Sequence, residues 1–222
     1  MVIKVGTQVV TNSESEKRNL LEQGVAALQL NLSENQINQL MLYLDLLIKW
    51  NGVYNLTSVR NPIDMVKQHL LDSLSAVFAF KNALNILDVG AGGGLPGIVI
   101  AIVYPNTKIA LIDTVNKKTA FLKQVKAELK LDNVTVYTGR VEQLQVVELF
   151  DVITSRAFSE LSNFVNWAGH LLTKRGQMIA LKGQLPEDEI AVLPAGWLVK
   201  KVQAISVPTL EAQRHLLWIE QQ

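Results

Sequence analysis

Asp88-Val89-Gly90-Ala91-Gly92-Gly93-Gly94-Leu95-Pro96-Gly97 is the stretch of sequence that decides the fold. It directly follows Asn85–Val89, a short apolar segment that predicts a strand, and it precedes a predicted helix. Glycines allow positive φ angles and let the backbone approach a ligand closely, and a proline suits the start of a helix. A glycine loop in this position therefore predicts a cofactor-binding turn in an α/β fold.

Two kinds of cofactor fit such a loop. Gly92, Gly94 and Gly97 satisfy the G-x-G-x-x-G fingerprint of dinucleotide-binding turns, although that match is weak when taken alone. However, an acidic residue precedes the glycines, and the register Asp88-x-Gly90-x-Gly92-x-Gly94 is typical of the first motif of S-adenosylmethionine enzymes. A pyrophosphate favours a helix N-terminus without a carboxylate beside it, whereas the ammonium and sulfonium of S-adenosyl-L-methionine accommodate an acidic neighbour. The residues therefore favour S-adenosyl-L-methionine.

The ends of the next two predicted strands supply further candidates for the cofactor site. Asp113 ends the second strand, about 20 residues past the loop, where a carboxylate accepts hydrogen bonds from ribose hydroxyls in either cofactor class. Asp113 also fits an ordinary turn that binds nothing. Gly139-Arg140-Val141-Glu142 follows the third strand, where a backbone amide and an apolar side chain typically contact the adenine.

From Asn85 onward, short apolar strands alternate with helices, which is typical of βαβ units and a mostly parallel sheet. The last two strands face each other across Pro208 and Thr209, too little chain for a crossover helix, so we expect an antiparallel pair. The seven predicted strands are Asn85–Val89, Lys108–Ile112, Val134–Thr138, Asp151–Ser155, Gln177–Lys182, Trp197–Val207 and His215–Glu220.

The sequence before these strands predicts helices, after a leader over residues 1–13 that has no strong period. The predicted helices are Glu14–Leu30, a second that follows a capping box at Ser33 and Gln36 and stops near Trp50, and a third from the cap Asn61 to about Phe80. We expect residues 1–80 to form an N-terminal helical appendage and residues 81–222 to form the cofactor-binding domain. The expected fold class is α/β, a Rossmann-like class I S-adenosylmethionine methyltransferase fold.

Composition excludes several classes of protein. Apolar residues make up 49% of the 222 residues, and no apolar run approaches the length of a membrane span, so we expect a globular, cytoplasmic protein. The absence of cysteine excludes disulfides and thiolate nucleophiles, and no His/Asp/Glu cluster has metal-site spacing, so we expect no metal. The net charge of +1 means that any RNA target must be recognised through clustered basic residues and its folded structure.

Five motifs in order, spread from about Leu40 to Leu217, resemble one family: glucose-inhibited division protein B, the small-subunit (16S) rRNA guanine-N7 methyltransferases. The motifs are Lys49-Trp50-Asn51-x-x-Tyr54-Asn55-Leu56-Thr57-Ser58-Val59-Arg60, His69-x-Leu71-Asp72-Ser73-Leu74, the glycine loop through Leu95-Pro96-Gly97, Ser155-Arg156-Ala157-Phe158, and Ala180-Leu181-Lys182-Gly183. Gly93 is a mild departure, since relatives often carry a bulkier residue there.

The resemblance implies which residues bind the cofactor and the RNA. With the glycine loop, it assigns Gly90, Gly92, Leu95, Val141, Glu142 and Arg156 to the cofactor, beside the ribose candidate Asp113. It places Arg140 and Arg214 near the RNA or the target base, although either arginine also fits a solvated surface position. The implied substrate is a 16S rRNA loop near the decoding centre, and we expect an assembled or partly assembled small subunit to present it.

The residues are consistent with methylation of a ring nitrogen. Methylation of a pyrimidine at C5 needs a cysteine, and none is present. Methylation of an exocyclic amine usually uses an Asn/Asp-Pro-Pro-aromatic tetrapeptide after the fourth strand, where this chain has Thr154-Ser155-Arg156-Ala157. Guanine N7 has an exposed lone pair and no proton to lose, so proximity and in-line alignment suffice without a general base.

Two other functions remain as alternatives, a nicotinamide-dependent oxidoreductase and a non-catalytic nucleotide-binding partner protein. The first lacks a catalytic tyrosine–lysine pair or a histidine after a strand end, and the second needs neither the glycine loop nor Arg156. His69 is expected to be a core or capping histidine. The lysines from Lys117 to Lys130 are expected to form the solvated face of a helix, with an RNA-contact stripe as the alternative.

Overall fold

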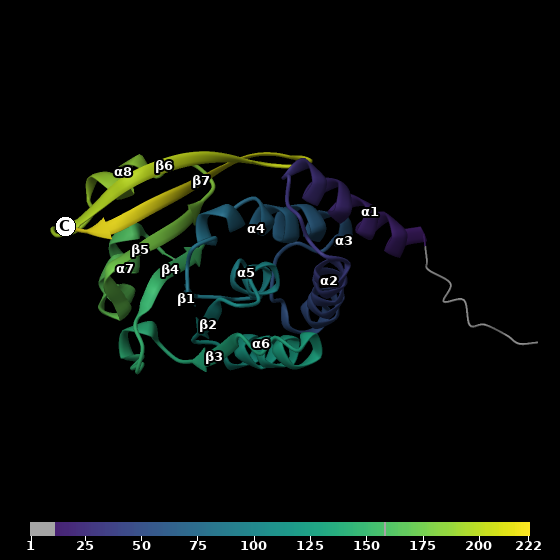
Figure 1. The fold of residues 1–222 in the computed structure, drawn as a ribbon, viewed down its shortest axis with the longest axis horizontal. Helices are drawn as coiled ribbons and strands as arrows, with labels where there is room; N and C mark the ends of the chain where they lie inside the picture. The colour runs from purple at the N-terminus through teal and green to yellow at the C-terminus, as the bar shows by residue number, and fades with distance from the viewer. Residues whose placement is uncertain (1–11, 158) are drawn as a thin grey trace, which may run out of the picture.

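The computed structural model describes residues 12–157 and 159–222, which form one seven-stranded sheet in the order β3-β2-β1-β4-β5-β7-β6 (Figure 1). Predictions for residues 1–11 and for Phe158 lie outside the described residues. The strands are β1 (Asn85–Val89), β2 (Lys108–Asp113), β3 (Val134–Thr138), β4 (Phe150–Arg156), β5 (Leu172–Lys182), β6 (Trp197–Val207) and β7 (Leu210–Gln221).

Strand pairing confirms the predicted fold class. Strands β1 to β5 pair in parallel, whereas β7 is antiparallel to both β5 and β6. The two antiparallel strands β6 and β7 meet at a tight turn in which Val207 pairs with Leu210 and Thr209 has a φ of 64°. Strand order reverses between β1 and β4, and open α/β sheets bind ligands at the carboxyl ends of strands beside such a reversal.

The predicted bounds of β1, β3 and β6 are confirmed, but those of β5 and β7 are wrong at their starts. Strand β5 begins at Leu172 rather than Gln177, and β7 begins at Leu210 rather than His215. The missed segments hold exposed polar residues, among them Arg175 and Gln213, so they lack the alternating apolar pattern from which strands were predicted.

The N-terminal helices are α1 (Asn12–Ala27) and α2 (Glu34–Tyr54), and the predicted capping box at Ser33 and Gln36 is confirmed. Asn61 caps the third segment as predicted, with its side chain accepting from two backbone N–H groups. That segment is not one regular helix, however. It consists of α3 (Pro62–Met65), a π-helical turn η1 (Val66–Leu71), α4 (Asp72–Leu74) and a 3-10 turn η2 (Val77–Phe80). A π turn of this kind is frequent at functional sites.

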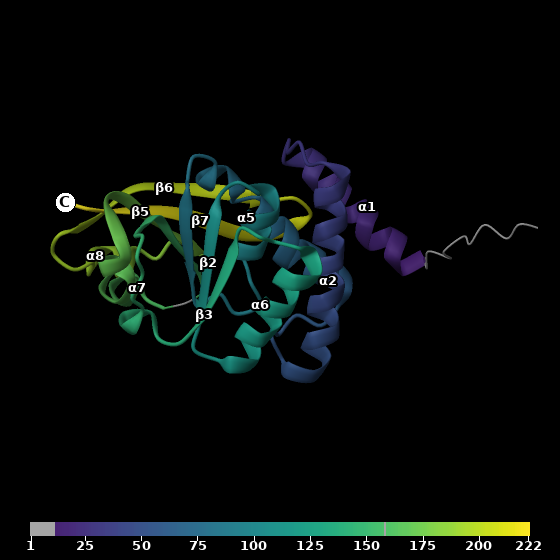
Figure 2. The same ribbon diagram turned by 60° about the horizontal axis from the view of Figure 1, so that its bottom comes forward.

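Helices cover both faces of the sheet, as Figure 2 shows. Alternate residues of β1 point to opposite faces, with Ile86 in one apolar cluster and Leu87 in the other. The first cluster joins the N-terminal helices to α5 (Gly97–Val103) and α6 (Asn116–Leu129), and the second lies under α7 (Leu161–Ala168). A short helix α8 (Glu187–Ala191) precedes β6. The boundary drawn at residue 80 stays a prediction.

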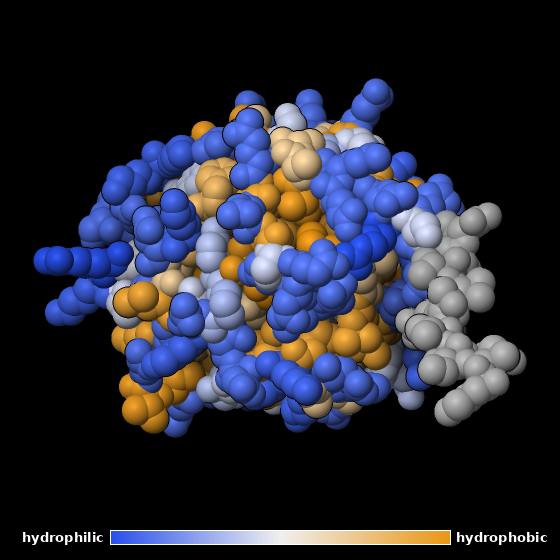
Figure 3. Space-filling view, turned by 45° about the vertical axis from the view of Figure 1, so that its right-hand side comes forward, coloured by the Kyte–Doolittle hydropathy of each residue, from blue (hydrophilic) through white to orange (hydrophobic). Residues whose placement is uncertain are grey.

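Polar side chains cover most of the face in the space-filling view, with apolar surface visible between them (Figure 3). Among residues 12–157 and 159–222, no helix has both the length and the apolar character needed to cross a bilayer.

We expect Leu44→Ala in α2 to destabilise the whole chain by about 2–5 kcal/mol, because Leu44 is fully buried in the cluster shared with the sheet helices. Leu42, on the same helix and 41% exposed, is the matched control, and Leu42→Ala is expected to cost about 0.5 kcal/mol or less. Urea unfolding followed by circular dichroism measures both. Equal losses, or a separate early transition of the N-terminal helices in Leu44→Ala, would contradict the shared core.

Candidate functional site

The glycine loop lies between β1 and α5, at the point where strand order reverses. Gly90, Gly92 and Gly94 have φ angles of 67°, 56° and 92°, a region that side chains other than glycine rarely adopt. A Cβ built on Gly92 would meet only the carbonyl oxygen of Gly90, at 3.7 Å, so the space beside this residue is open. The loop is therefore a cradle with room for a ligand against its backbone.

Two carboxylates hold the backbone of this loop. Oδ2 of Asp113 accepts from Gly92 N–H at 3.0 Å, and its Oδ1 accepts from Val115 N–H at 2.9 Å. Oδ2 of Asp88 accepts from Gly97 N–H at 2.9 Å. Asp113 thus has a structural contact that the sequence did not predict, in addition to its proposed role at the ribose.

Asp88 is fully buried, and its Oδ1 has no hydrogen-bond partner among the described residues. Burial raises the pKa of this carboxyl to about 7, against the opposing effects of the Gly97 N–H donor and the positive charge of Arg156. The sequence placed Asp88 beside the ligand, but the structure buries it beneath the loop, where it fixes the start of α5.

Two cavities meet at the loop, one of about 620 Å³ and one of about 410 Å³, and both are lined by Gly90, Lys118 and Ala157. All nine residues predicted for the site line one cavity or the other. The first cavity includes Gly92, Leu95, Arg156 and Arg214, and the second includes Asp113, Arg140, Val141 and Glu142. The two arginines that the resemblance placed near the RNA therefore lie in different cavities.

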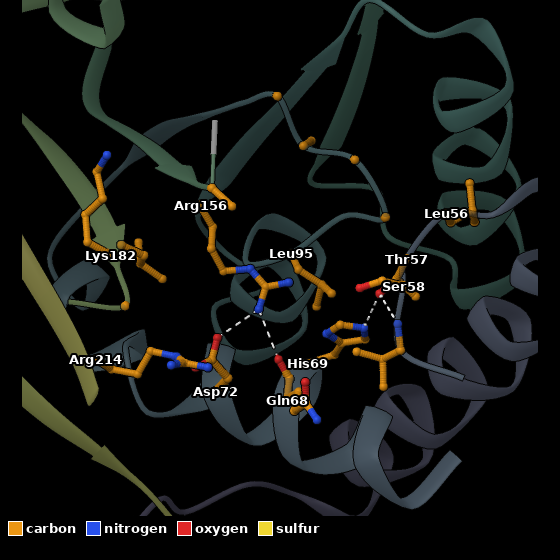
Figure 4. A pocket seen from close by; sticks show the side chains of 18 of the residues that line it. Leu56, Thr57, Ser58, Gln68, His69, Asp72, Leu95, Arg156, Lys182 and Arg214 are labelled. Carbon is orange, nitrogen blue, oxygen red and sulfur yellow. Dashed lines mark hydrogen bonds and ion pairs between the residues drawn. The ribbon is translucent and has the colours of Figure 1, made fainter. Parts of the chain in front are cut away.

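Asp72 forms two ion pairs in the first cavity, and no role was predicted for it from the sequence. Its Oδ2 accepts from Nη1 of Arg156 at 2.8 Å, and its Oδ1 accepts from Nε of Arg214 (Figure 4). Nη1 of Arg156 also donates to the carbonyl oxygen of Gln68, at 3.2 Å. The side chain of Asp72 is only 4% exposed, so the two cations share one buried carboxylate. The motif His69-x-Leu71-Asp72 was the available signal.

The loop between α2 and α3 forms another wall of the first cavity, and a buried asparagine organises it. Asn51 accepts from Thr57 N–H at 2.9 Å and donates to the carbonyl oxygen of Val59 at 3.0 Å. Nε2 of His69 lies 2.8 Å from Oγ1 of Thr57. Burial, followed by the nearby charge of Arg156, lowers the pKa of His69 to about 4, so this histidine is neutral at pH 7. The expected core histidine is thus a buried part of the first cavity's lining.

A tyrosine connects α2 to the glycine loop. The hydroxyl of Tyr43, which is fully buried, donates to the carbonyl oxygen of Gly93 at 2.5 Å. This contact could not be predicted from the sequence, because Tyr43 lies in an ordinary apolar stripe of the helix.

Arg140 and Glu142 form an exposed ion pair with 3.0 Å between Nη2 and Oε1. A hydrogen bond from its own backbone N–H lowers the pKa of Glu142, and Arg140 lowers it further. On α6, Lys117 and Lys123 are exposed, as is Lys130 at the C-cap of the helix, which fits the expected solvated face. Lys118 instead turns toward the cavities, with its Nζ 3.6 Å from Oδ2 of Asp113. Among the described residues, no group of His, Asp and Glu is arranged to hold a metal ion.

The fold is that of the class I methyltransferases. The chain is similar to a putative O-methyltransferase from Klebsiella pneumoniae, with a TM-score of 0.57 and 14% identity over 93% of this chain and 99% of that one. It is also similar to the N-methyltransferase NodS from Bradyrhizobium japonicum WM9 in complex with S-adenosyl-L-homocysteine, with a TM-score of 0.55 and 11% identity over 78% of this chain and 98% of that one. These likenesses concern the fold alone.

Sequence comparison narrows the class to one family. Residues 36–217 match the family model described as rRNA small subunit methyltransferase G. The ribosomal RNA small subunit methyltransferases G of Janthinobacterium sp. (strain Marseille) and Herminiimonas arsenicoxydans are 65% and 62% identical, covering 90% of this chain and 93% and 94% of theirs. The chain belongs to this family. It is therefore an S-adenosylmethionine-dependent enzyme that methylates small-subunit rRNA, and the predicted enzyme class and cofactor are confirmed.

The raised pKa of Asp88 predicts a specific pH dependence of stability. The Asp88 carboxyl has a pKa of about 7 in the folded chain but an ordinary value of 3.8 in the unfolded chain. Between these two values the folded chain retains a proton that the unfolded chain has released, so the free energy of unfolding falls as pH rises. Asp88→Asn preserves an acceptor for Gly97 N–H but cannot ionise. Urea unfolding from pH 5 to pH 8 is expected to show the native chain losing stability relative to Asp88→Asn. Parallel curves for the two chains would show that Asp88 ionises normally.

We expect Arg156→Ala to weaken binding of S-adenosyl-L-methionine by at least about tenfold, since a hydrogen bond to a charged group typically contributes that much. Arg175→Ala is the control, because Arg175 is exposed on β5 and lines neither cavity. Calorimetric titration measures both affinities. Similar losses at the two positions would remove the special role of Arg156.

Proposed function

We propose that this protein transfers a methyl group from S-adenosyl-L-methionine to N7 of one guanine in 16S rRNA, in a loop near the decoding centre. The observation that carries the proposal is the match of residues 36–217 to the rRNA small subunit methyltransferase G family. The meeting of two cavities at Gly90 and Ala157 supports it, because one cavity can hold the adenosine while the other holds the methionine end and the target base.

The proposed arrangement gives each predicted cofactor residue a place. In the second cavity, Asp113 would accept from the ribose hydroxyls, and Val141 would pack on the adenine beside Glu142. In the first cavity, the methionine end would lie against the backbone of Gly92 and beside Leu95, with its carboxylate near the Arg156 guanidinium. The open space beside Gly92 fits this placement.

The chemistry needs alignment rather than proton transfer. S-adenosyl-L-methionine supplies an electrophilic methyl group, and guanine N7 presents a lone pair with no proton to remove. Among the titratable groups of the first cavity, His69 contacts Thr57, Asp72 binds two arginines, and Lys182 binds Glu189 at 2.8 Å. Since N7 has no proton to remove, we infer that the protein accelerates transfer by orienting the base in line with the methyl group.

We propose that residues around the openings of the two cavities recognise the RNA. Arg214 lies in the first cavity, where its guanidinium can contact O6 of the target guanine or a phosphate, and Arg140 lies at the second cavity. A net charge of +1 gives little general attraction for RNA, so we propose that an assembled or partly assembled small subunit presents the folded target. The proposed site of action is therefore the cytoplasm.

The product provides the direct test. Methylation at N7 leaves a fixed positive charge on the guanine imidazole ring, which makes the ring reducible by borohydride and the RNA chain cleavable by aniline. Small-subunit rRNA from cells that contain the gene is expected to cleave at one more guanine than rRNA from cells that lack it. In vitro, purified protein is expected to add that site to unmethylated small subunits faster than to bare rRNA.

Cells that carry the Arg175→Ala gene serve as the control and are expected to retain the additional cleavage site. Identical cleavage patterns with and without the gene would overturn the N7 assignment. Equal rates on bare rRNA and on subunits would overturn only the dependence on assembly.

A further inference from the structure

Asp72 binds two arginines whose strands are not neighbours. Arg156 ends β4, Arg214 stands in β7, and β5 lies between these two strands in the sheet. Asp72 approaches from the first residue of α4, 84 residues before Arg156 and 142 residues before Arg214 in the sequence. The carboxylate is thus the direct link between two guanidinium groups that the sheet itself does not bring into contact.

The contacts of each arginine leave donors for a ligand. Nη1 of Arg156 is used by Asp72 and by the carbonyl oxygen of Gln68, while Arg214 uses Nε for Asp72 and Nη1 for the carbonyl oxygen of Gln213. The Arg156 and Arg214 side chains are 20% and 26% exposed, and all three charged groups line the first cavity. Two cations and one anion leave a net positive charge at this wall, suited to a carboxylate or a phosphate.

We propose that Asp72 is a positioning residue that orients Arg156 toward the cofactor and Arg214 toward the RNA as one coupled unit. The proposal rests on the roles proposed above for these two arginines. Without the carboxylate, the two guanidinium groups would repel each other in a partly buried site, and each long side chain would regain rotamer freedom. Both arginines would then lose their orientation through a single change at Asp72.

A double-mutant cycle tests the coupling. Asp72→Asn alone is expected to weaken binding of S-adenosyl-L-methionine by about tenfold, comparable to Arg156→Gln alone. Because Asp72 acts through Arg156, adding Asp72→Asn to Arg156→Gln is expected to cost no more than about another twofold. A second cycle combines Asp72→Asn with Arg214→Gln and measures kcat/KM for methylation of the small subunit. The double variant is again expected to lose less than the two single variants would lose together. Calorimetry reports cofactor affinity whichever RNA atom is methylated, so the first cycle stands apart from the N7 assignment.

Asp45→Asn is the matched control. Asp45 lies on α2, pairs with Lys17 of α1 at 2.7 Å, and lines neither cavity. It is expected to leave cofactor affinity unchanged. If Asp72 only fastens α4 to the sheet, Asp72→Asn will lower the melting temperature while the folded variant binds the cofactor with native affinity. That result, or full additivity in both cycles, would overturn the proposal.

Asp72→Asn also leaves two arginines without their carboxylate, which can prevent folding. In that case the test compares cofactor affinity between Arg156→Gln, which keeps the pair of Asp72 with Arg214, and Arg156→Gln/Asp72→Asn, which holds a single guanidinium. The proposal requires affinities within about twofold of each other in these two chains. A larger loss on removing Asp72 from Arg156→Gln would contradict it.

Discussion

The backbone of the glycine loop must hold a left-handed, open conformation, and the rest of the site depends on this constraint. Asp113 holds Gly92 from the end of β2, Asp88 holds Gly97 from beneath, and Tyr43 binds the Gly93 carbonyl from α2. Each contact comes from a different element, so the loop conformation is determined by the packed sheet and helices together. Once the loop is held open, two cavities can meet at Gly90, and we propose that they accept the two ends of one cofactor.

The N-terminal helical segment contributes directly to the site. It supplies the loop wall around Thr57, the buried His69 beneath it and the carboxylate of Asp72. The π turn η1 leads directly into Asp72, at the start of α4. Packing of residues 12–80 on the sheet therefore completes the first cavity, where we propose that cofactor and RNA bind.

Local patterns in the sequence predicted much of the fold, and the family resemblance supplied most of the residues that line the cavities. Strands such as Asn85–Val89 and Trp197–Val207 are bounded by clear turns, and the glycine register is a local signal. The pairing of Asp72 with Arg214 could not be predicted, because it joins residues 142 positions apart and leaves no periodic trace in the sequence. The positions of Arg140 and Arg214 in separate cavities likewise depend on the order of the strands in the sheet, which was not predicted from the sequence. Buried Asp88 shows the same limit, since its position before the glycines says nothing of its depth.

We propose that one molecule of S-adenosyl-L-methionine spans both cavities, with its methyl group facing the first cavity, where the target base would lie. A crystal structure of the protein with S-adenosyl-L-homocysteine measures this most directly. The account predicts the adenine against Val141, the ribose hydroxyls at Asp113 and the amino-acid end beside Gly92 and Arg156. A ligand confined to one cavity, or one whose sulfur points away from the first cavity, would contradict it.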